Sequence, residues 1–197
     1  MKVRSVDIFI FDEVEVLDFA GPFEVFSVTD WQKDPKPFCV SLVSEKPGPI
    51  LARNGFSVNP HHAFMDDHPA DIIIVPGGFG TRREMHNPTV LNWVRQHAAK
   101  GTMILSVCTG SLILGAAGLL DGLEATTHHL RYDLLQETAP QCRVQRQRRV
   151  VDAGNIVTSG GIAAGIDMSF HVVARLLGEQ TARETAEYME YPWKVMS

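Results

Sequence analysis

The feature that most restricts the fold of this chain is a run of four consecutive apolar β-branched residues, 72–75, that ends in Pro76-Gly77-Gly78. A strand with apolar side chains on both faces must be covered on both faces, as strands in parallel sheets are. Parallel neighbours need long crossover connections, which are usually helices. The run therefore predicts an α/β fold in which helices cover both faces of a mostly parallel sheet.

The rest of the sequence alternates strand and helix patterns as this fold requires. Strands are predicted over 3–11, 38–43, 72–75 and 102–107, and helices over 17–28, 88–99, 161–177 and 180–188. The dipeptide Asn54-Gly55 predicts a short hairpin over 50–58, and a later ribbon is predicted over 143–151 and 156–158. No repeat, linker or low-complexity tract interrupts the chain, so residues 1–197 are expected to form a single domain.

The composition is that of an ordinary globular protein and argues against nucleic acid or a membrane as a partner. The 18 basic and 23 acidic residues give a net charge of −5, which leaves no basic field to attract nucleic acid. The longest mostly apolar stretch, 104–120, is interrupted by polar residues and is too short for a confident membrane span. The first ten residues lack the apolar region of a secretory signal, so we expect a cytoplasmic protein.

One of the three cysteines has a sequence context that indicates reactivity. Cys39, Cys108 and Cys142 are too few and too scattered for a disulfide scaffold. Cys108 directly follows a predicted strand and precedes a helix, with the small residues Ser106 and Gly110 on either side, which suits a sharp turn that presents a nucleophile. A helix amino end favours a thiolate. We therefore predict that Cys108 is a nucleophile, and the alternative is a small buried hydrophobe.

Two other loops are expected to meet Cys108, because parallel sheets place their sites where strands end. The Gly78 amide, in a glycine-rich loop, and the Thr109 amide are candidate donors to developing negative charge, although a plain turn is an alternative for the loop. Asp18 lies among apolar residues. Desolvation and a neighbouring thiolate would keep its carboxyl protonated, which makes Asp18 a candidate general acid, with a helix cap as the alternative.

Two histidine pairs, His61-His62 and His128-His129, raise the question of a metal site. Neighbours on an extended strand point to opposite faces and cannot share an ion, so no metal is expected. His128 is a candidate for orienting a substrate or tuning the thiol, and a structural histidine is the alternative. Asp167 is interpreted as a first-turn helix charge, and the basic stretch 143–149 as a solvated ribbon face.

Five segments together resemble the DJ-1/PfpI superfamily of class I glutamine amidotransferase-like proteins. They are LDFAGP at 17–22, VPGG at 75–78, SVCTGSLILGAAGLL at 106–120, ATTH at 125–128 and TSGGIAAGID at 158–167. Within the superfamily, the chain is most similar to isocyanide hydratases and to the amidotransferase-like domain of AraC-type regulators. The resemblance implies a flavodoxin-like sandwich with a nucleophile elbow and a homodimeric assembly.

The resemblance also implies a chemistry. Isocyanide hydratases are lyases that convert isocyanides to N-substituted formamides without a metal or organic cofactor. On this sequence, Cys108 would be the nucleophile and Asp18 the proton donor and later the base for water, while the amides of Gly78 and Thr109 would steady negative charge. Many relatives carry Glu at the position of Asp18, whereas the hydratase branch carries Asp. Phe79 is bulky where similar hydratases have a small polar residue, so it bears on the size of the pocket.

Two further functions stay open for a protein of this family. The same cysteine would also serve a glyoxalase-like or amidase-like enzyme that acts on small carbonyl compounds. A non-enzymatic small-molecule or redox sensor is the other alternative. AraC-type regulators carry a helix-turn-helix region after the sensor, and only residues 189–197 follow Tyr188, so a freestanding regulator is not expected. All of these functions take a small molecule as ligand or substrate.

Overall fold

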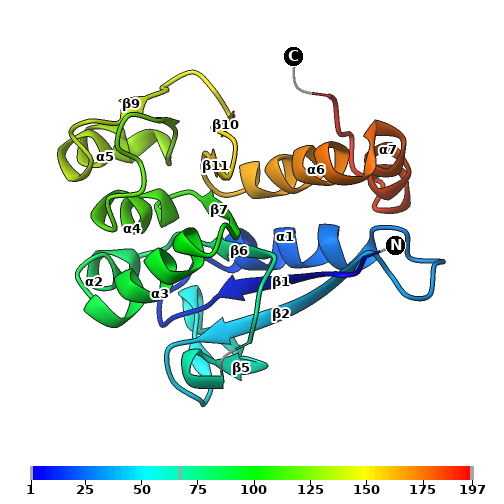
Figure 1. Cartoon of the computed structure of the whole chain (residues 1–197), viewed down its shortest axis with the longest axis horizontal. Coiled ribbons are helices and arrows are strands. Elements are labelled where there is room, and N and C mark those ends of the chain that lie inside the picture. Colours follow the sequence, from blue (N-terminus) through cyan, green and yellow to red (C-terminus); the bar gives the residue numbers. More distant parts are fainter. Residues whose placement is uncertain (1, 67, 196–197) are drawn as a thin grey trace.

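The computed structural model of the chain describes residues 2–66 and 68–195 and has the α/β architecture that the sequence predicts (Figure 1). The strands of the central sheet are β1 (Arg4–Phe9), β2 (Phe38–Ser44), β5 (His62–Ala63), β6 (Ile72–Val75), β7 (Met103–Val107), β10 (Val150–Asp152) and β11 (Ile156–Ser159). They are arranged in the order β10-β11-β7-β6-β1-β2-β5. All neighbouring pairs are parallel except β10 and β11.

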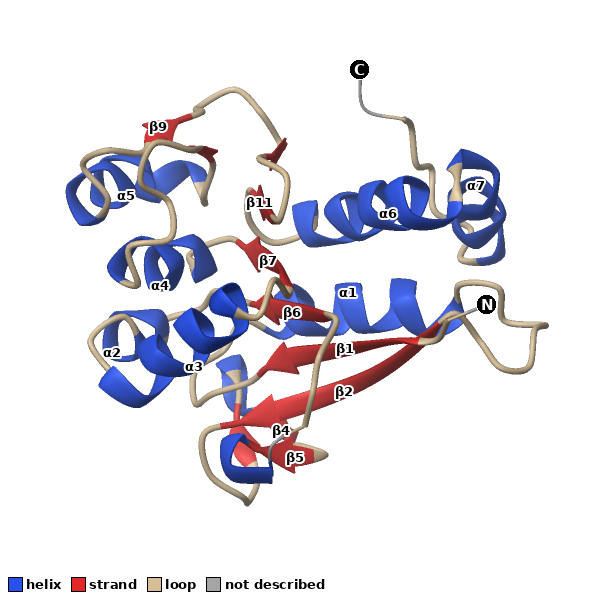
Figure 2. Ribbon diagram, viewed as in Figure 1, coloured by secondary structure: helices blue, strands red, loops and turns tan. Residues whose placement is uncertain are grey.

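Helices pack on the sheet and on one another, as Figure 2 shows. The helices are α1 (Val16–Val28), α2 (Thr81–Glu84), α3 (Pro88–Ala99), α4 (Gly110–Ala116), α5 (Tyr132–Thr138), α6 (Ala164–Leu177) and α7 (Glu179–Tyr188). Helix α1 packs against α6, and α3 packs against α4. None of the helices in the described ranges combines the length and the apolar content that crossing a bilayer requires.

The apolar run from which the fold was predicted is the central part of the core. Strand β6 lies between β1 and β7, and all four of its residues are buried. Its neighbours contribute the fully buried Ile8 on β1 and Ile104 and Leu105 on β7. Because each parallel strand ends at the same edge, the residues that follow β6 and β7 are brought side by side.

Most local elements begin and end close to where the sequence predicts them. Helix α3 has the predicted bounds, and its N-cap Asn87 accepts a 3.0 Å hydrogen bond from the Thr89 N–H. The predicted hairpin forms from β3 (Ile50–Leu51) and β4 (Ser57–Val58), with Asn54 between them at a φ of 59°. The two strands form a small sheet of their own.

The predicted ribbon over 143–158 is wrong in its first half. The residues of β9 (Arg143–Val144) pair in parallel with β8 (Glu124–Ala125). Of the predicted ribbon, only the antiparallel pair of β10 and β11 forms. Between β9 and β10 the chain is exposed, as expected for a basic stretch, and its arginines form ion pairs with other segments. These pairs are Arg146–Asp133, Arg148–Glu124 and Arg149–Asp167. An alternating pattern indicates an extended chain but does not identify its partner, which is why the ribbon was predicted incorrectly.

Candidate functional site

Cys108 lies at the turn between β7 and α4 with a φ of 55°. This left-handed conformation is uncommon for a residue with a side chain and is typical of strained functional turns. The Cys108 N–H donates to the carbonyl oxygens of Ser159 and Gly160, each at 3.1 Å, and the Thr127 hydroxyl donates to the Cys108 carbonyl oxygen at 2.9 Å. The end of β11 and the segment after β8 therefore hold the predicted strand-to-helix turn in place.

The position two residues after the cysteine requires a small residue for a direct steric reason. A Cβ atom at Gly110 would lie 1.9 Å from the carbonyl oxygen of Val75, at the end of β6. Helix α4 therefore begins in contact with the backbone of the neighbouring strand. This contact brings the loop after β6 next to Cys108, as the sequence predicts.

Asp18 lies in the first turn of α1, and its side chain is fully buried. The helix cap is Glu15, so the capping alternative for Asp18 is wrong. Its Oδ2 accepts a 2.9 Å hydrogen bond from the Gly77 N–H, and its Oδ1 has no hydrogen-bond partner in the part of the chain that the structure describes. Burial raises the pKa of Asp18 to about 8, the Gly77 bond opposes this rise, and the charge of Glu15 adds to it. The predicted protonated acid is thus supported by its surroundings.

The Asp18 carboxyl and the Cys108 thiol are neighbours, and each affects the pKa of the other. Burial and the Asp18 charge raise the pKa of Cys108 well above its usual value, although the amide and hydroxyl of Thr109 oppose the rise. The expectation that the helix end would favour a thiolate is therefore wrong, because desolvation outweighs it. Burial therefore favours the uncharged form of both side chains.

The two predicted backbone donors lie side by side, but they are not equally free. The Gly78 N–H donates to Oγ1 of Thr109 at 3.1 Å, and the Thr81 hydroxyl, which donates to the Gly78 carbonyl oxygen at 2.7 Å, lies 3.1 Å from Oγ1 of Thr109. The Gly78 amide therefore orients the Thr109 side chain. The Thr109 amide, in contrast, acts directly on the Cys108 sulfur, where it stabilises negative charge.

A cavity of ≈ 190 Å³ opens in front of the nucleophile turn. It is lined by Glu15, Gly78, Phe79, Arg82, Cys108, Thr109, His128, Leu130, Arg131 and Ile162. Phe79 is 54% exposed, and the guanidinium groups of Arg53 and Arg82 lie 4.1 and 4.9 Å from its ring centre. Larger hollows of ≈ 370, ≈ 310 and ≈ 220 Å³ lie elsewhere, and none of them has a cysteine in its wall. The cavity beside Cys108 is therefore the candidate active site.

Sequence reasoning placed Phe79 and His128 at this cavity, and both line it. It did not single out Glu15, the cap of α1, Arg82 on α2, or Arg131 at the end of a short 3₁₀ helix. Glu15 lies three residues before Asp18, and that spacing was the one available signal. For the two arginines no local pattern distinguishes a cavity wall from an ordinary surface.

His128 lies beside the thiol, but the expectation that it belongs to an extended strand is wrong. It caps a short 3₁₀ helix (His129–Arg131), its Nδ1 accepts from the Leu130 N–H at 3.2 Å, and its ring stacks on that of His129. A Cβ atom at Gly161 would lie 2.3 Å from His128 Cδ2 and 3.0 Å from Cys108 Sγ. Burial lowers the pKa of His128, which favours the neutral ring.

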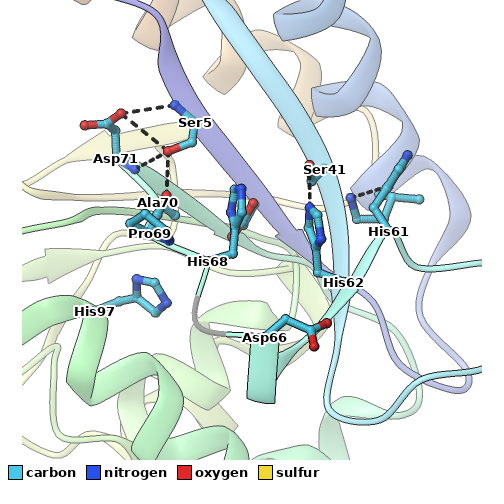
Figure 3. A network of polar contacts seen from close by, with 12 residues as sticks. Ser5, Ser41, His61, His62, Asp66, His68, Pro69, Ala70, Asp71 and His97 are labelled. Carbon is cyan, nitrogen blue, oxygen red and sulfur yellow. Dashed lines mark hydrogen bonds and ion pairs between the residues drawn. The ribbon is translucent and has the colours of Figure 1, made fainter.

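The other histidine pair takes part in a separate polar network around β2 and β5, shown in Figure 3. The Leu42 N–H donates to His61 Nδ1 at 2.9 Å, and His62 Nε2 lies 3.3 Å from the Ser41 hydroxyl. Thus the two rings have different partners. Within residues 2–66 and 68–195, no three His, Cys, Asp or Glu side chains are grouped in a way that suits a metal ion.

Comparisons with known proteins agree on the family of this chain. The pattern of the DJ-1/PfpI family matches residues 4–175. Isonitrile hydratase from Pseudomonas putida is 38% identical over 188 residues, which is 95% of this chain and 78% of that protein. The HTH-type transcriptional regulator CdhR from Pseudomonas aeruginosa is 35% identical over 74% of this chain, but the chain spans only 43% of that regulator.

Solved structures show the same architecture. A ThiJ/PfpI family protein from Pseudomonas syringae superimposes with a TM-score of 0.87 at 28% identity, over all of this chain and 78% of that one. DJ-1beta from Drosophila melanogaster has a TM-score of 0.85 at 16% identity, over 98% of this chain and 100% of that one, which shows a shared fold. With its parallel sheet, strained cysteine turn and buried acid, the chain belongs to the DJ-1/PfpI family.

Proposed function

We propose that this protein is a cysteine-dependent hydratase that converts isocyanides to N-substituted formamides. One observation carries the proposal: the thiol of Cys108, which lines a small cavity, lies beside the buried carboxyl of Asp18, whose pKa is raised. Addition to an isocyanide requires a nucleophile and a proton donor at the same carbon. The similarity to isonitrile hydratase, which extends over most of the chain, favours this substrate.

The first step forms a covalent adduct. The sulfur of Cys108 attacks the terminal isocyanide carbon, and Asp18 delivers its proton to the same carbon. The proton of the thiol passes to the Asp18 carboxylate, which restores the acid. The product is a thioimidate, S–CH=N–R, and no preformed thiolate is needed. This suits a site where burial raises the pKa of both groups.

The second step releases the formamide. Water adds to the thioimidate carbon and the nitrogen is protonated, which gives the tetrahedral adduct S–CH(OH)–NH–R. The C–S bond then breaks, the carbonyl forms, and the sulfur leaves as a thiolate that is reprotonated. The Thr109 amide, which acts on the sulfur, stabilises that departing charge. Isocyanide and water are the only reactants, and the scheme needs no metal or organic cofactor.

The cavity suits a compact substrate with an apolar substituent. Its walls include the exposed apolar side chains of Phe79, Leu130 and Ile162. A volume of ≈ 190 Å³ is small for a ligand site. Phe79 is therefore expected to restrict the size of the substituent.

Turnover of a panel of alkyl and aryl isocyanides, followed by formamide production, tests the proposal. We expect activity in the natural protein and its loss in Cys108→Ser and Asp18→Asn. The panel also includes methylglyoxal and simple amides, because the same pair of side chains suits glyoxalase-like or amidase-like chemistry. Turnover of methylglyoxal with none of any isocyanide would contradict the proposal.

A sensor role is the second candidate, because regulators are among the similar proteins. A sensor would bind its ligand reversibly at the Cys108 cavity without releasing a product. Calorimetric titration with the same isocyanides and aldehydes, combined with product analysis, distinguishes binding from turnover. A homodimer stays a prediction from the family, and light scattering during size-exclusion chromatography measures it.

A further inference from the structure

The hydration step needs a group that takes a proton from water, and the position of Asp18 makes it poorly suited to that task. Asp18 has no exposed surface, and it is not part of the cavity wall. It is held behind the thiol by the Gly77 N–H. Asp18 can therefore exchange protons with groups attached to the sulfur, whereas water in the cavity meets other residues first.

The polar groups that line the cavity differ in whether they can accept a proton. Arg82 and Arg131 have donors only. Nδ1 of His128 accepts a hydrogen bond from the Leu130 N–H, so the neutral ring carries its proton on Nε2 and presents a donor there. The Thr109 hydroxyl oxygen already accepts from the Gly78 N–H at 3.1 Å.

Glu15 is the remaining acceptor of the cavity wall. It is half-buried as the cap of α1, and its N–H donates to the Gly77 carbonyl oxygen at 2.9 Å, which fixes the backbone next to the glycine loop. In the described part of the chain, its carboxylate forms neither an ion pair nor a side-chain hydrogen bond. Glu15, whose carboxylate is unpaired in the described residues, thus belongs to the wall of the cavity that contains the nucleophile.

We propose that Glu15 is the general base that activates water for attack on the thioimidate, while Asp18 handles the protons of the adduct. This inference rests on the proposed hydratase function. Two carboxyl groups in unlike surroundings, one buried and one at the cavity, are the usual arrangement for divided acid and base roles.

The proton transfers balance in this scheme. Glu15 takes a proton from water as the oxygen bonds to carbon, and Asp18 gives its proton to the imine nitrogen. When the C–S bond breaks, the hydroxyl proton of the adduct passes to Asp18 and the proton on Glu15 passes to the sulfur. The protein then returns to its starting state of thiol, acid and carboxylate.

The variant Glu15→Gln separates the two chemical steps. It leaves Cys108 and Asp18 able to form the adduct but removes the base for water. We expect formamide release to slow at least about 100-fold, in the range of a lost general base, while intact-mass spectrometry detects protein that is heavier by one isocyanide molecule. Glu24→Gln, an exposed change of the same charge on the same helix, is the matched control and should behave like the natural protein.

Three outcomes overturn the inference. If Glu15→Gln hydrates isocyanides at the natural rate, another group activates water. If Glu15→Gln loses activity without accumulating the adduct, Glu15 acts in the first step or through the effect of its charge on the pKa of Asp18. Finally, if the natural protein turns over no isocyanide, the proposed function itself fails, and that result is distinct from the first two.

Discussion

The Gly77 N–H donates a 2.9 Å hydrogen bond to Oδ2 of Asp18 and so links the buried acid to the loop beside the nucleophile. A side chain at position 77 is incompatible with this contact. A Cβ atom there would lie 2.8 Å from the same carboxyl oxygen and 2.6 Å from the Thr109 nitrogen. The glycine thus permits β6, α1 and the cysteine turn to meet at one point.

Replacement of Asp18 by Asn should abolish catalysis without unfolding the protein. The amide retains the shape of the side chain and an acceptor for the Gly77 N–H, but it cannot deliver the proton. We expect kcat/KM for isocyanides to fall by about 100-fold or more, in the range of a lost general acid. A melting temperature close to that of the natural protein would show that the loss is chemical.

The activity of the natural protein should decrease at alkaline pH. Burial raises the pKa of Asp18 to about 8, and the proposed first step requires the protonated form. Turnover should therefore be nearly constant through neutral pH and then fall about tenfold per pH unit above that value. A profile of kcat/KM that keeps rising beyond pH 9 would contradict this assignment.

The change Gly161→Ala should impair activity, whereas Gly160→Ala should not. A Cβ atom at position 161 would collide with the His128 ring, 2.3 Å away, and would lie 3.0 Å from Cys108 Sγ. At Gly160 the nearest atoms are 3.8 Å away, which is ordinary contact. We expect a several-fold loss of kcat/KM only in the first variant, measured beside the second under the same conditions. Equal activities would show that His128 moves aside freely.

Replacement of Phe79 by Ser should widen the range of substrates. The ring is part of the cavity wall, and the guanidinium groups of Arg53 and Arg82 lie over it. Without it, bulky isocyanides should gain in kcat/KM relative to small ones. The measurement is the ratio of kcat/KM for a bulky isocyanide to kcat/KM for a small one, determined for the natural protein and for Phe79→Ser. An unchanged ratio would mean that other walls set the size limit.

Stability should depend on pH through His97, which is buried on α3. Burial lowers the pKa of His97 to about 4, and the charge of Lys100 acts in the same direction. A base with a depressed pKa in the folded state contributes stability above its unfolded pKa of 6.5, and this contribution is lost as the pH falls towards 4. Over this pH range, the free energy of unfolding of the natural protein should fall by about 2 kcal/mol more than that of His97→Gln. Urea unfolding between pH 7 and 4.5 compares the two.

Several features of this protein follow from local patterns alone. The apolar run at 72–75 predicted a strand covered on both faces, and Pro88 with the apolar spacing that follows it predicted the bounds of α3, because periodicity acts over a few residues. The small residues around Cys108 predicted the sharp turn for the same reason, since the steric limits lie within the turn and at its nearest neighbour.

Other features were decided only when distant segments came together. The sequence could not show that β9 pairs with β8 or that the Gly78 N–H donates its hydrogen bond to the Thr109 side chain. Nor could it show that Glu15 belongs to the wall of the Cys108 cavity. The protonation of the thiol was predicted wrongly for the same reason. A helix end is visible in the sequence, but the desolvation that outweighs it depends on atoms from elements far apart along the chain.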